Sequence, residues 1–196
     1  MKRIFDVIVA GLGLLFLFPV FIIVSMLIVA DSKGGVFFRQ YRVGRFGKDF
    51  RIHKFRTMFI DSEKKGRITV GQDARVTRVG WYLRKYKIDE LPQLIDVLSG
   101  TMSLVGPRPE VREFIDEYPD DIREKVLSVR PGITDLASIE MVDENEILSS
   151  YDDPRRAYID IILPIKQRYY LDYVANNSVK YDCVIIWKTI IKILSR

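Results

Sequence analysis

The stretch IFDVIVAGLGLLFLFPVFIIVSMLIVA, residues 4–30, decides the class of this protein, because Asp6 is its only charged residue. About 20 apolar residues suffice to cross the hydrocarbon core of a bilayer as a helix, so this segment is long enough. A cleaved signal sequence is an alternative, since Lys2 and Arg3 precede the run, but signal sequences have apolar regions of about 15 residues or fewer. The sequence therefore predicts a membrane-embedded hydrophobic helix at residues 1–31.

The path of this helix through the membrane has two interpretations. Pro19 lies near the middle, where it lacks an N–H to donate and clashes with a preceding carbonyl, so a break is expected there. Basic residues flank both ends, and the positive-inside rule favours the cytoplasm for both of them. A helix-break-helix that enters one leaflet and returns, a re-entrant segment, satisfies that rule. A straight spanning helix also tolerates proline, so this second interpretation stays open. The flanking residues are Lys2 and Arg3 before the segment, then Lys33, Arg39, Arg42 and Arg45 after it.

Positive charge is concentrated in the first part of the chain. The 196 residues carry a formal charge of +5, but residues 1–60 hold ten basic against three acidic side chains, which is +7 and leaves −2 for the remainder. A basic segment beside an apolar one indicates anionic lipid headgroups or phosphates as partners, with nucleic acid as the other candidate. The single cysteine, Cys183, forms no intrachain disulfide, and its apolar surroundings favour a buried packing role.

Residues 32–196 are long enough for a domain with its own core, and their pattern predicts a cytosolic, helix-dominated α+β fold. VFFRQYRVG and KDFRIHKFRTM, residues 36–44 and 48–58, predict a short β-hairpin around a glycine-containing turn. An exposed loop is expected next, at residues 61–80. Helices are expected from residue 81, at 90–100 and at 110–129, with proline-containing loops at 103–110 and 130–138.

The end of the chain, residues 178–196, predicts an amphipathic helix with a basic component. Such a helix suits a membrane surface. A terminal helix that packs its apolar face on the core fits the same pattern. The residues alone leave both interpretations open.

Two acids, Asp89 and Glu90, stand directly before an apolar run in KIDELPQLIDVLSG, residues 87–100. One interpretation is structural: Asp89 caps a helix, Glu90 favours its dipole, and Pro92 fits its first turn. The other is chemical, because a carboxylate can bind Mg²⁺ or attack phosphorus, and arginine can hold a phosphate. Three basic residues lie just upstream: Arg84, Lys85 and Lys87.

Three motifs together, VFFRQYRVGRFGKDFRIHKFRTM, KIDELPQLIDVLSGTMSLVGPRPE and VRPGIT, resemble the bacterial sugar transferase family, the monotopic phosphoglycosyl transferases that act on polyprenyl phosphate. The resemblance runs in order along nearly the whole chain, which looks like the minimal catalytic form, without further spanning helices ahead of it. It implies an enzyme at the cytoplasmic face of the bacterial inner membrane. That enzyme would move a sugar phosphate from a UDP-sugar to undecaprenyl phosphate and release UMP, the first membrane step towards an O-antigen, capsule or exopolysaccharide.

By the same resemblance, Asp89 is the nucleophile that forms an aspartyl-phosphosugar intermediate, with ping-pong kinetics, and it is also the ligand of Mg²⁺. Glu90 assists it, and Arg84 is placed to hold the donor phosphate. The expected partners are the UDP-sugar, undecaprenyl phosphate and membrane lipid, with no nucleic acid and with self-association left open. His53 is expected to be structural. Further phosphate or nucleotide contacts are expected at Lys54, Arg56, Arg108 and Arg130, with ordinary surface charges as the alternative.

The chain departs from its relatives at two places. Many relatives carry Ser-Pro at the bend in the membrane segment, where this chain has Phe18 and Pro19. After VRPGIT many continue Gly-Leu-Ala-Gln, where this chain has DLAS at residues 135–138, so the donor sugar does not carry over. The alternative function is a membrane-tethered basic module that binds anionic lipid or nucleic acid, which leaves the Asp89–Glu90 pair without a purpose.

Overall fold

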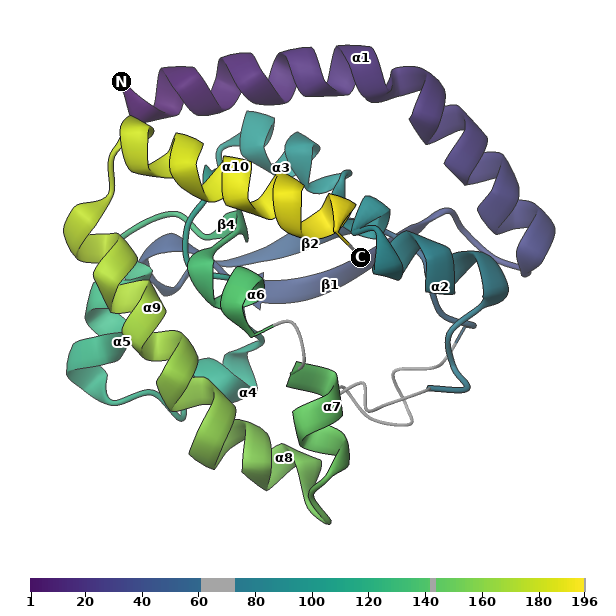
Figure 1. The fold of residues 1–196 in the computed structure, drawn as a ribbon. Coiled ribbons are helices and arrows are strands. Elements are labelled where there is room, and N and C mark those ends of the chain that lie inside the picture. The colour runs from purple at the N-terminus through teal and green to yellow at the C-terminus, as the bar shows by residue number, and fades with distance from the viewer. Residues whose placement is uncertain (61–72, 142–143, 196) are drawn as a thin grey trace.

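The structure, a computed structural model, describes residues 1–60, 73–141 and 144–195. Helices dominate it, and two small two-stranded sheets lie among them (Figure 1). The predicted helix-dominated α+β class is thus confirmed. Of the predicted loop at 61–80, residues 61–72 lie outside the described residues.

The predicted hairpin is present. Strand β1, Phe37–Val43, pairs antiparallel with β2, Asp49–Phe55. The turn between them contains the 3-10 helix η1, Arg45–Gly47, in which Phe46 and Gly47 have φ values of 59° and 73°. Positive φ favours glycine, so Gly47 suits this turn and Phe46 adopts an uncommon conformation.

A second sheet lies where the sequence predicted two loops. Strand β3, Ser103–Val105, pairs parallel with β4, Gly132–Thr134. Three-residue strands are too short for an alternating pattern, which is why sequence reasoning missed them. Glycine is needed at this junction, because a Cβ on Gly132 would lie 2.1 Å from the backbone nitrogen of Gly106.

The remaining helices surround these sheets. The predicted helix at 110–129 is two helices, α4 and α5, because Pro119 interrupts it and begins the second one. The bounds are α1 Lys2–Asp31, α2 Arg78–Lys85, η3 Ile88–Glu90, α3 Gln93–Ser99, α4 Arg112–Ile115, α5 Asp120–Leu127, α6 Leu136–Glu140, α7 Glu144–Ser149, α8 Pro154–Ala157, η4 Tyr158–Ile162, α9 Leu163–Asn176 and α10 Val179–Leu194.

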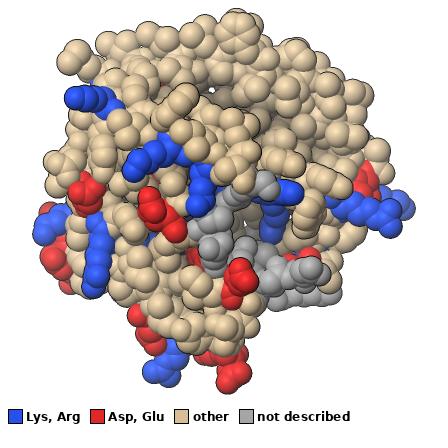
Figure 2. Space-filling view, in the orientation of Figure 1, with Lys and Arg blue, Asp and Glu red and all other residues tan. Residues whose placement is uncertain are grey.

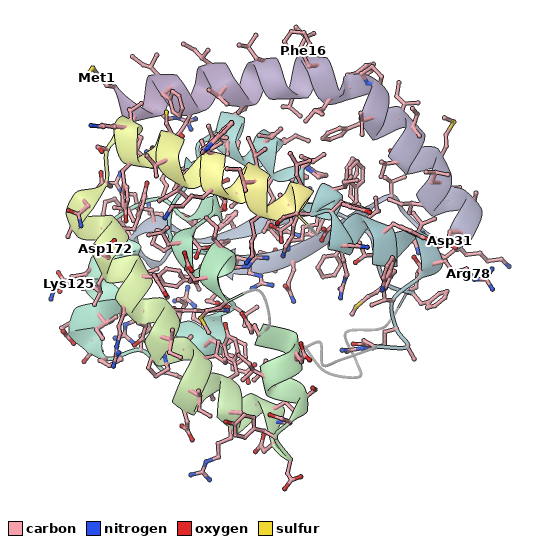
Figure 3. All side chains as sticks on the ribbon, in the orientation of Figure 1. Met1, Phe16, Asp31, Arg78, Lys125 and Asp172 are labelled. Atoms are coloured by element: carbon pink, nitrogen blue, oxygen red, sulfur yellow. The ribbon has the colours of Figure 1, made fainter. Side chains whose placement is uncertain are left out.

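Helix α1 arches over one side of the molecule. It is continuous through Pro19 rather than broken there, and it bends after Phe16, which points away from the domain (Figures 1 and 3). A proline removes one hydrogen bond and bends a helix without having to end it. Phe18 and Pro19 are both exposed.

Polar contacts hold the first turn of α1 on the domain. Lys2 Nζ donates to Asp182 Oδ2 of α10 at 2.5 Å, and the Arg3 guanidinium donates to the carbonyl of Val97 in α3 at 2.6 Å. Asp6 is fully buried and accepts a hydrogen bond from Ser103 Oγ of β3 at 2.9 Å. The two basic residues expected to face the cytoplasm therefore bind the protein's own domain.

The last turn of α1 is held as well. Asp31 Oδ2 accepts from the backbone nitrogen of Val79 in α2 at 3.0 Å, and Asp31 and Arg78 lie at the same corner in Figure 3. Val24 and Ile28 are buried against Phe55 and Leu83. Both ends of α1 are thus fixed to one domain.

The core has one part under α1 and another among α5, η4 and α9. The terminal helix α10 contributes Ile185 to the part under α1, so its packing role is confirmed, while Trp187 on its other face is 64% exposed. Cys183 is exposed, and its predicted burial is wrong because it lies on that outer face.

Candidate active site

The two acids lie in η3, a single turn between α2 and α3. Lys87 enters this turn with a left-handed backbone, at φ 56°. Neither acid caps a helix: the residue before α3 is Pro92, and no side-chain cap is made at η3 or at α3. The capping interpretation of Asp89 is therefore wrong. Asp89 and Glu90 are each only 7% exposed.

Glu90 is held between two cations from different parts of the chain. Lys54 Nζ, on β2, donates to Glu90 Oε1 at 2.9 Å, and Arg108 Nη2, in the loop after β3, donates to the same oxygen at 2.5 Å. Arg108 Nη1 adds a contact to Oε2 at 3.3 Å. Burial alone would raise the pKa of Glu90, but Arg108 and Lys54 outweigh it and hold that pKa well below the ordinary value. Glu90 is thus a fixed negative charge.

Asp89 has the opposite environment. Its Oδ1 is buried and has no hydrogen-bond partner among the described residues. Burial, followed by repulsion from Glu90, raises its pKa above the ordinary value, against the attraction of Lys54, Lys87 and Arg84. A carboxylate that is desolvated and has a free oxygen is poised to attack an electrophile or to bind a cation. The two neighbouring acids therefore have different chemical capacities.

Arg84 lies in the last turn of α2, close enough to the acid pair for both charges to influence its pKa. Its Nε donates to Thr57 Oγ1 at 2.9 Å. Burial lowers its pKa, and the charge of Asp89 is the largest influence in the other direction. Guanidinium groups hold phosphates through planar paired hydrogen bonds, so Arg84 supplies the kind of anion-binding group that the sequence predicted.

The structure brings three of the five predicted phosphate contacts, Arg84, Lys54 and Arg108, to the acid pair and places the other two apart from it. Arg56 Nε donates to the carbonyl of Gly35 at 2.6 Å, and its other two nitrogens donate to Ser32, so it fixes the chain after α1. Arg130 Nε donates to the carbonyl of Gly100 at 2.8 Å, at the end of α3.

His53 has a structural environment, as the sequence suggested. Its backbone nitrogen and its Nδ1 both contact the Asp96 carboxylate, at 2.8 and 2.6 Å. This pair joins β2 to α3. It therefore fixes the strand that carries Lys54 relative to the helix that follows Asp89.

A buried charge network behind Arg108 escaped sequence reasoning. Arg42 Nη1, on β1, lies 3.8 Å from Glu110 Oε2, and Tyr158 donates to Glu110 Oε1 at 2.7 Å. Glu90 and Arg108 both influence the pKa of Arg42, which burial lowers. Its only signal in the sequence is the acidic end of the VGPRPE motif, and an acid is not a candidate phosphate contact.

Gln93 is a second residue that only the structure reveals. It is the first residue of α3, it is 1% exposed, and its Nε2 has no hydrogen-bond partner among the described residues. A glutamine in an apolar helical run carries no sequence signal for chemistry.

The acid pair also bears on metal binding. Among residues 1–60, 73–141 and 144–195, no three His, Cys, Asp or Glu side chains gather into a metal-binding group. The free buried oxygen of Asp89 nevertheless fits Mg²⁺, which commonly uses one or two carboxylates together with substrate phosphates. The carboxylate oxygens of Glu90 are already engaged by Lys54 and Arg108.

Known proteins are similar to this sequence along nearly its whole length. A UDP-N-acetylgalactosamine-undecaprenyl-phosphate N-acetylgalactosaminephosphotransferase of Aeromonas hydrophila is 39% identical over 197 residues, which cover 99% of this chain and 44% of that protein. A UDP-glucose:undecaprenyl-phosphate glucose-1-phosphate transferase of Klebsiella pneumoniae is 36% identical over 196 residues, 97% of this chain and 39% of the relative. The exopolysaccharide production protein ExoY of Sinorhizobium fredii is 35% identical over 205 residues, 96% of this chain and 83% of the relative.

The chain thus spans less than half the length of the Aeromonas and Klebsiella proteins. The family model described as bacterial sugar transferase matches residues 1–196. The chain belongs to the bacterial sugar transferase family.

Proposed function

We propose that this protein is a phosphoglycosyl transferase that moves a sugar phosphate from a UDP-sugar to undecaprenyl phosphate. The observation that carries the proposal is the buried Asp89 carboxylate with a free oxygen, close to Arg84 and Lys54 and beside Glu90, which Arg108 contacts. An anionic diphosphate needs such cations, and its transfer needs a nucleophile. The names of the Aeromonas and Klebsiella relatives support the same donor and acceptor classes.

The reaction has two displacements at one phosphorus atom. Asp89 Oδ1 attacks the β-phosphorus of the UDP-sugar, and the bond from that phosphorus to the bridging oxygen breaks, so UMP leaves with the electron pair. An oxygen of undecaprenyl phosphate then attacks the phosphorus of the aspartyl-phosphosugar, and the Asp89 carboxylate is released. The products are undecaprenyl-diphosphate-sugar and UMP, and ping-pong kinetics are expected.

Glu90 serves this reaction as a fixed charge. Its depressed pKa makes it a weak proton acceptor at neutral pH, and its oxygens are engaged by Lys54 and Arg108. It therefore holds these two cations beside Asp89 and prevents their charges from going uncompensated when substrate is absent. Arg84 lies near enough to Asp89 for the charge of that carboxylate to oppose the lowering of its pKa by burial, and its guanidinium is the group that we assign to the donor diphosphate.

Asp89 would also hold Mg²⁺, with the remaining ligands supplied by the donor phosphates and water. When bound, Mg²⁺ would neutralise charge on the diphosphate during transfer.

We also propose that α1 is re-entrant and places the domain on the cytoplasmic face of the membrane. Both of its ends are tied to the same domain, through Lys2 and Asp31, so neither end is free to cross to the other side. The outer side of the arch is apolar, and Figure 2 shows an almost uncharged surface along the edge where Figure 1 draws α1. Exposed Trp187 on α10 is the type of residue found at membrane interfaces.

The reaction is tested by measuring UMP release from a panel of UDP-sugars, with and without undecaprenyl phosphate, in the presence of Mg²⁺. Wild-type protein should release UMP rather than UDP, and donor alone should leave a phosphosugar on residue 89 that mass spectrometry detects. Asp89→Asn should abolish both, whereas Asp121→Asn, a change at an exposed residue of α5, should affect neither. Near-normal UMP release by Asp89→Asn would remove Asp89 from the nucleophile's role.

The topology is tested with a single cysteine in a short extension ahead of Met1, near residue 2, after exposed Cys183 has been replaced by serine. In sealed vesicles, membrane-impermeant maleimide should label that cysteine only from the side on which the catalytic domain lies. Labelling from the opposite side would contradict the re-entrant arrangement.

A further inference from the structure

Gln93 holds a buried hydrogen-bond donor that the folded chain leaves unused. The residue is 1% exposed, and its Nε2 finds no acceptor in the described part of the chain. Native proteins rarely leave a buried amide unpaired, because its lost hydration is not replaced. Its acceptor then comes from outside the described part of the chain, from a bound ligand or a water molecule.

The neighbouring nucleophile lacks a partner in the same way. Asp89 Oδ1 is also buried and unpaired, four residues before Gln93. The two residues between η3 and α3, Leu91 and Pro92, have right-handed helical backbones, at φ −56°, ψ −35° and φ −61°, ψ −16°. Leu94 N donates to the carbonyl of Leu91 at 3.1 Å, a bond of the 3-10 type. The chain therefore turns helically from Asp89 to Gln93, so the two side chains lie little more than one turn apart.

The segment that carries both residues contacts the strand that supplies the site with a cation, through η3 and through α3. The backbone nitrogen of His53 on β2 donates a hydrogen bond to Asp96, three residues after Gln93. Lys54, the next residue of β2, bonds Glu90. Along the chain Gln93 thus lies between the acid pair and the Asp96 contact to β2, in the segment that contacts the strand of Lys54.

We propose that the Gln93 side-chain amide donates a hydrogen bond to a non-bridging oxygen of the phosphoryl group that Asp89 receives. The inference rests on the proposed function and adds a catalytic residue to it. An amide nitrogen can only donate, so its partner is an acceptor such as a phosphoryl oxygen and not a metal ion. A neutral donor binds that oxygen without drawing the Asp89 carboxylate into an ion pair. Charge that develops on the phosphoryl oxygens during transfer strengthens the bond.

The test compares Gln93→Met and Gln93→Glu with wild-type protein in detergent micelles. Methionine keeps the length of the side chain without its donor, and glutamate keeps the shape while replacing the amide with a carboxylate. Gln167→Met is the matched control, because Gln167 is a buried glutamine on α9, outside the site. The measurements are kcat and KM for UMP release, and the Tm of the protein without ligand.

Both Gln93 variants should lose about 10- to 100-fold in kcat, the effect of losing one donor to a charged group, with KM close to that of wild type. The Tm of Gln93→Met should equal or exceed the wild-type Tm, since an unpaired polar group is removed. Gln167→Met should keep wild-type kcat.

Three results would overturn the inference while wild-type protein still releases UMP. They are a kcat of both variants within twofold of wild type, an effect confined to KM, and a loss of kcat that parallels a fall in Tm for both variants. Wild-type protein that releases no UMP from any UDP-sugar would overturn the proposed function, and the inference with it.

Discussion

Replacing Glu90 by glutamine tests whether this residue is the fixed counter-charge of the site. The change removes a buried charge and leaves Lys54 and Arg108 in place, with side chains only 16% and 25% exposed. Removing one partner of a buried ion pair costs about 3–5 kcal/mol. Two effects lower the figure: glutamine keeps one acceptor oxygen, and its neutrality relieves the repulsion of Asp89. We therefore expect the free energy of unfolding to fall by about 3 kcal/mol.

For a chain of this length, that loss corresponds to a Tm lower by about 6–12 °C. Differential scanning fluorimetry in detergent measures it, with Asp49→Asn as the control. Asp49 bonds Arg112 at 2.7 Å, but both side chains are about half exposed, so that pair is worth at most about 1 kcal/mol. The difference between wild type and Glu90→Gln should shrink in acid, because stability from a depressed carboxyl pKa is present above about pH 4.3 and lost as pH falls through the folded-state pKa. A Tm within about 2 °C of wild type at neutral pH would refute the buried-counter-charge reasoning.

Two further predictions concern the nucleophile and the first turn of α1. Because burial raises the pKa of Asp89, the ionised form of this residue lowers the stability of the fold. Asp89→Asn should therefore raise Tm at pH 8, and that gain should vanish as pH falls towards about 4. No gain at pH 8 would contradict the assignment of Asp89 as an unpaired buried charge. Lys2→Met leaves fully buried Asp182 with Tyr173 as its remaining side-chain partner and should lower the free energy of unfolding by about 2–3 kcal/mol. Hydrogen exchange should then accelerate in the first turns of α1, and an unchanged exchange rate there would show that the Lys2 contact does not hold the helix.

Sequence patterns predicted those elements whose residues carry their own periodicity. The hairpin of β1 and β2 alternates over seven residues a strand, and its turn contains glycine. The sheet of β3 and β4 was missed because each strand is three residues long and is specified by its distant partner. The bend of α1 followed from Pro19, but the expected break did not, because a proline removes one hydrogen bond without having to end a helix.

The residues of the site also differ in how far the sequence predicted their roles. The residues alone left the acid pair between a structural and a chemical role, and the resemblance to the sugar transferase family assigned it to catalysis. Which of the two acids keeps a free oxygen depends on Lys54 and Arg108, which come from separate elements. Arg56 and Arg108 both lie in motifs that the family resemblance covers, so the sequence does not distinguish their roles. In the folded chain Arg56 binds Ser32 after α1, whereas Arg108 binds Glu90 in the site. The role of Gln93 could not be predicted from sequence, because it rests on a buried side-chain nitrogen that has no hydrogen-bond partner among the described residues.

The attachment of α1 at both ends has a consequence for how the protein could be cut or grafted. Ala10 is completely buried, and a Cβ on Gly13 would lie 3.2 Å from Leu94 of α3, so this helix is one wall of the domain as well as its anchor. A chain that started at residue 32 would lack that wall and expose the apolar core beneath it, and we expect it to aggregate rather than to yield a water-soluble catalytic fragment. A foreign membrane helix in the same place would restore insertion without restoring the wall.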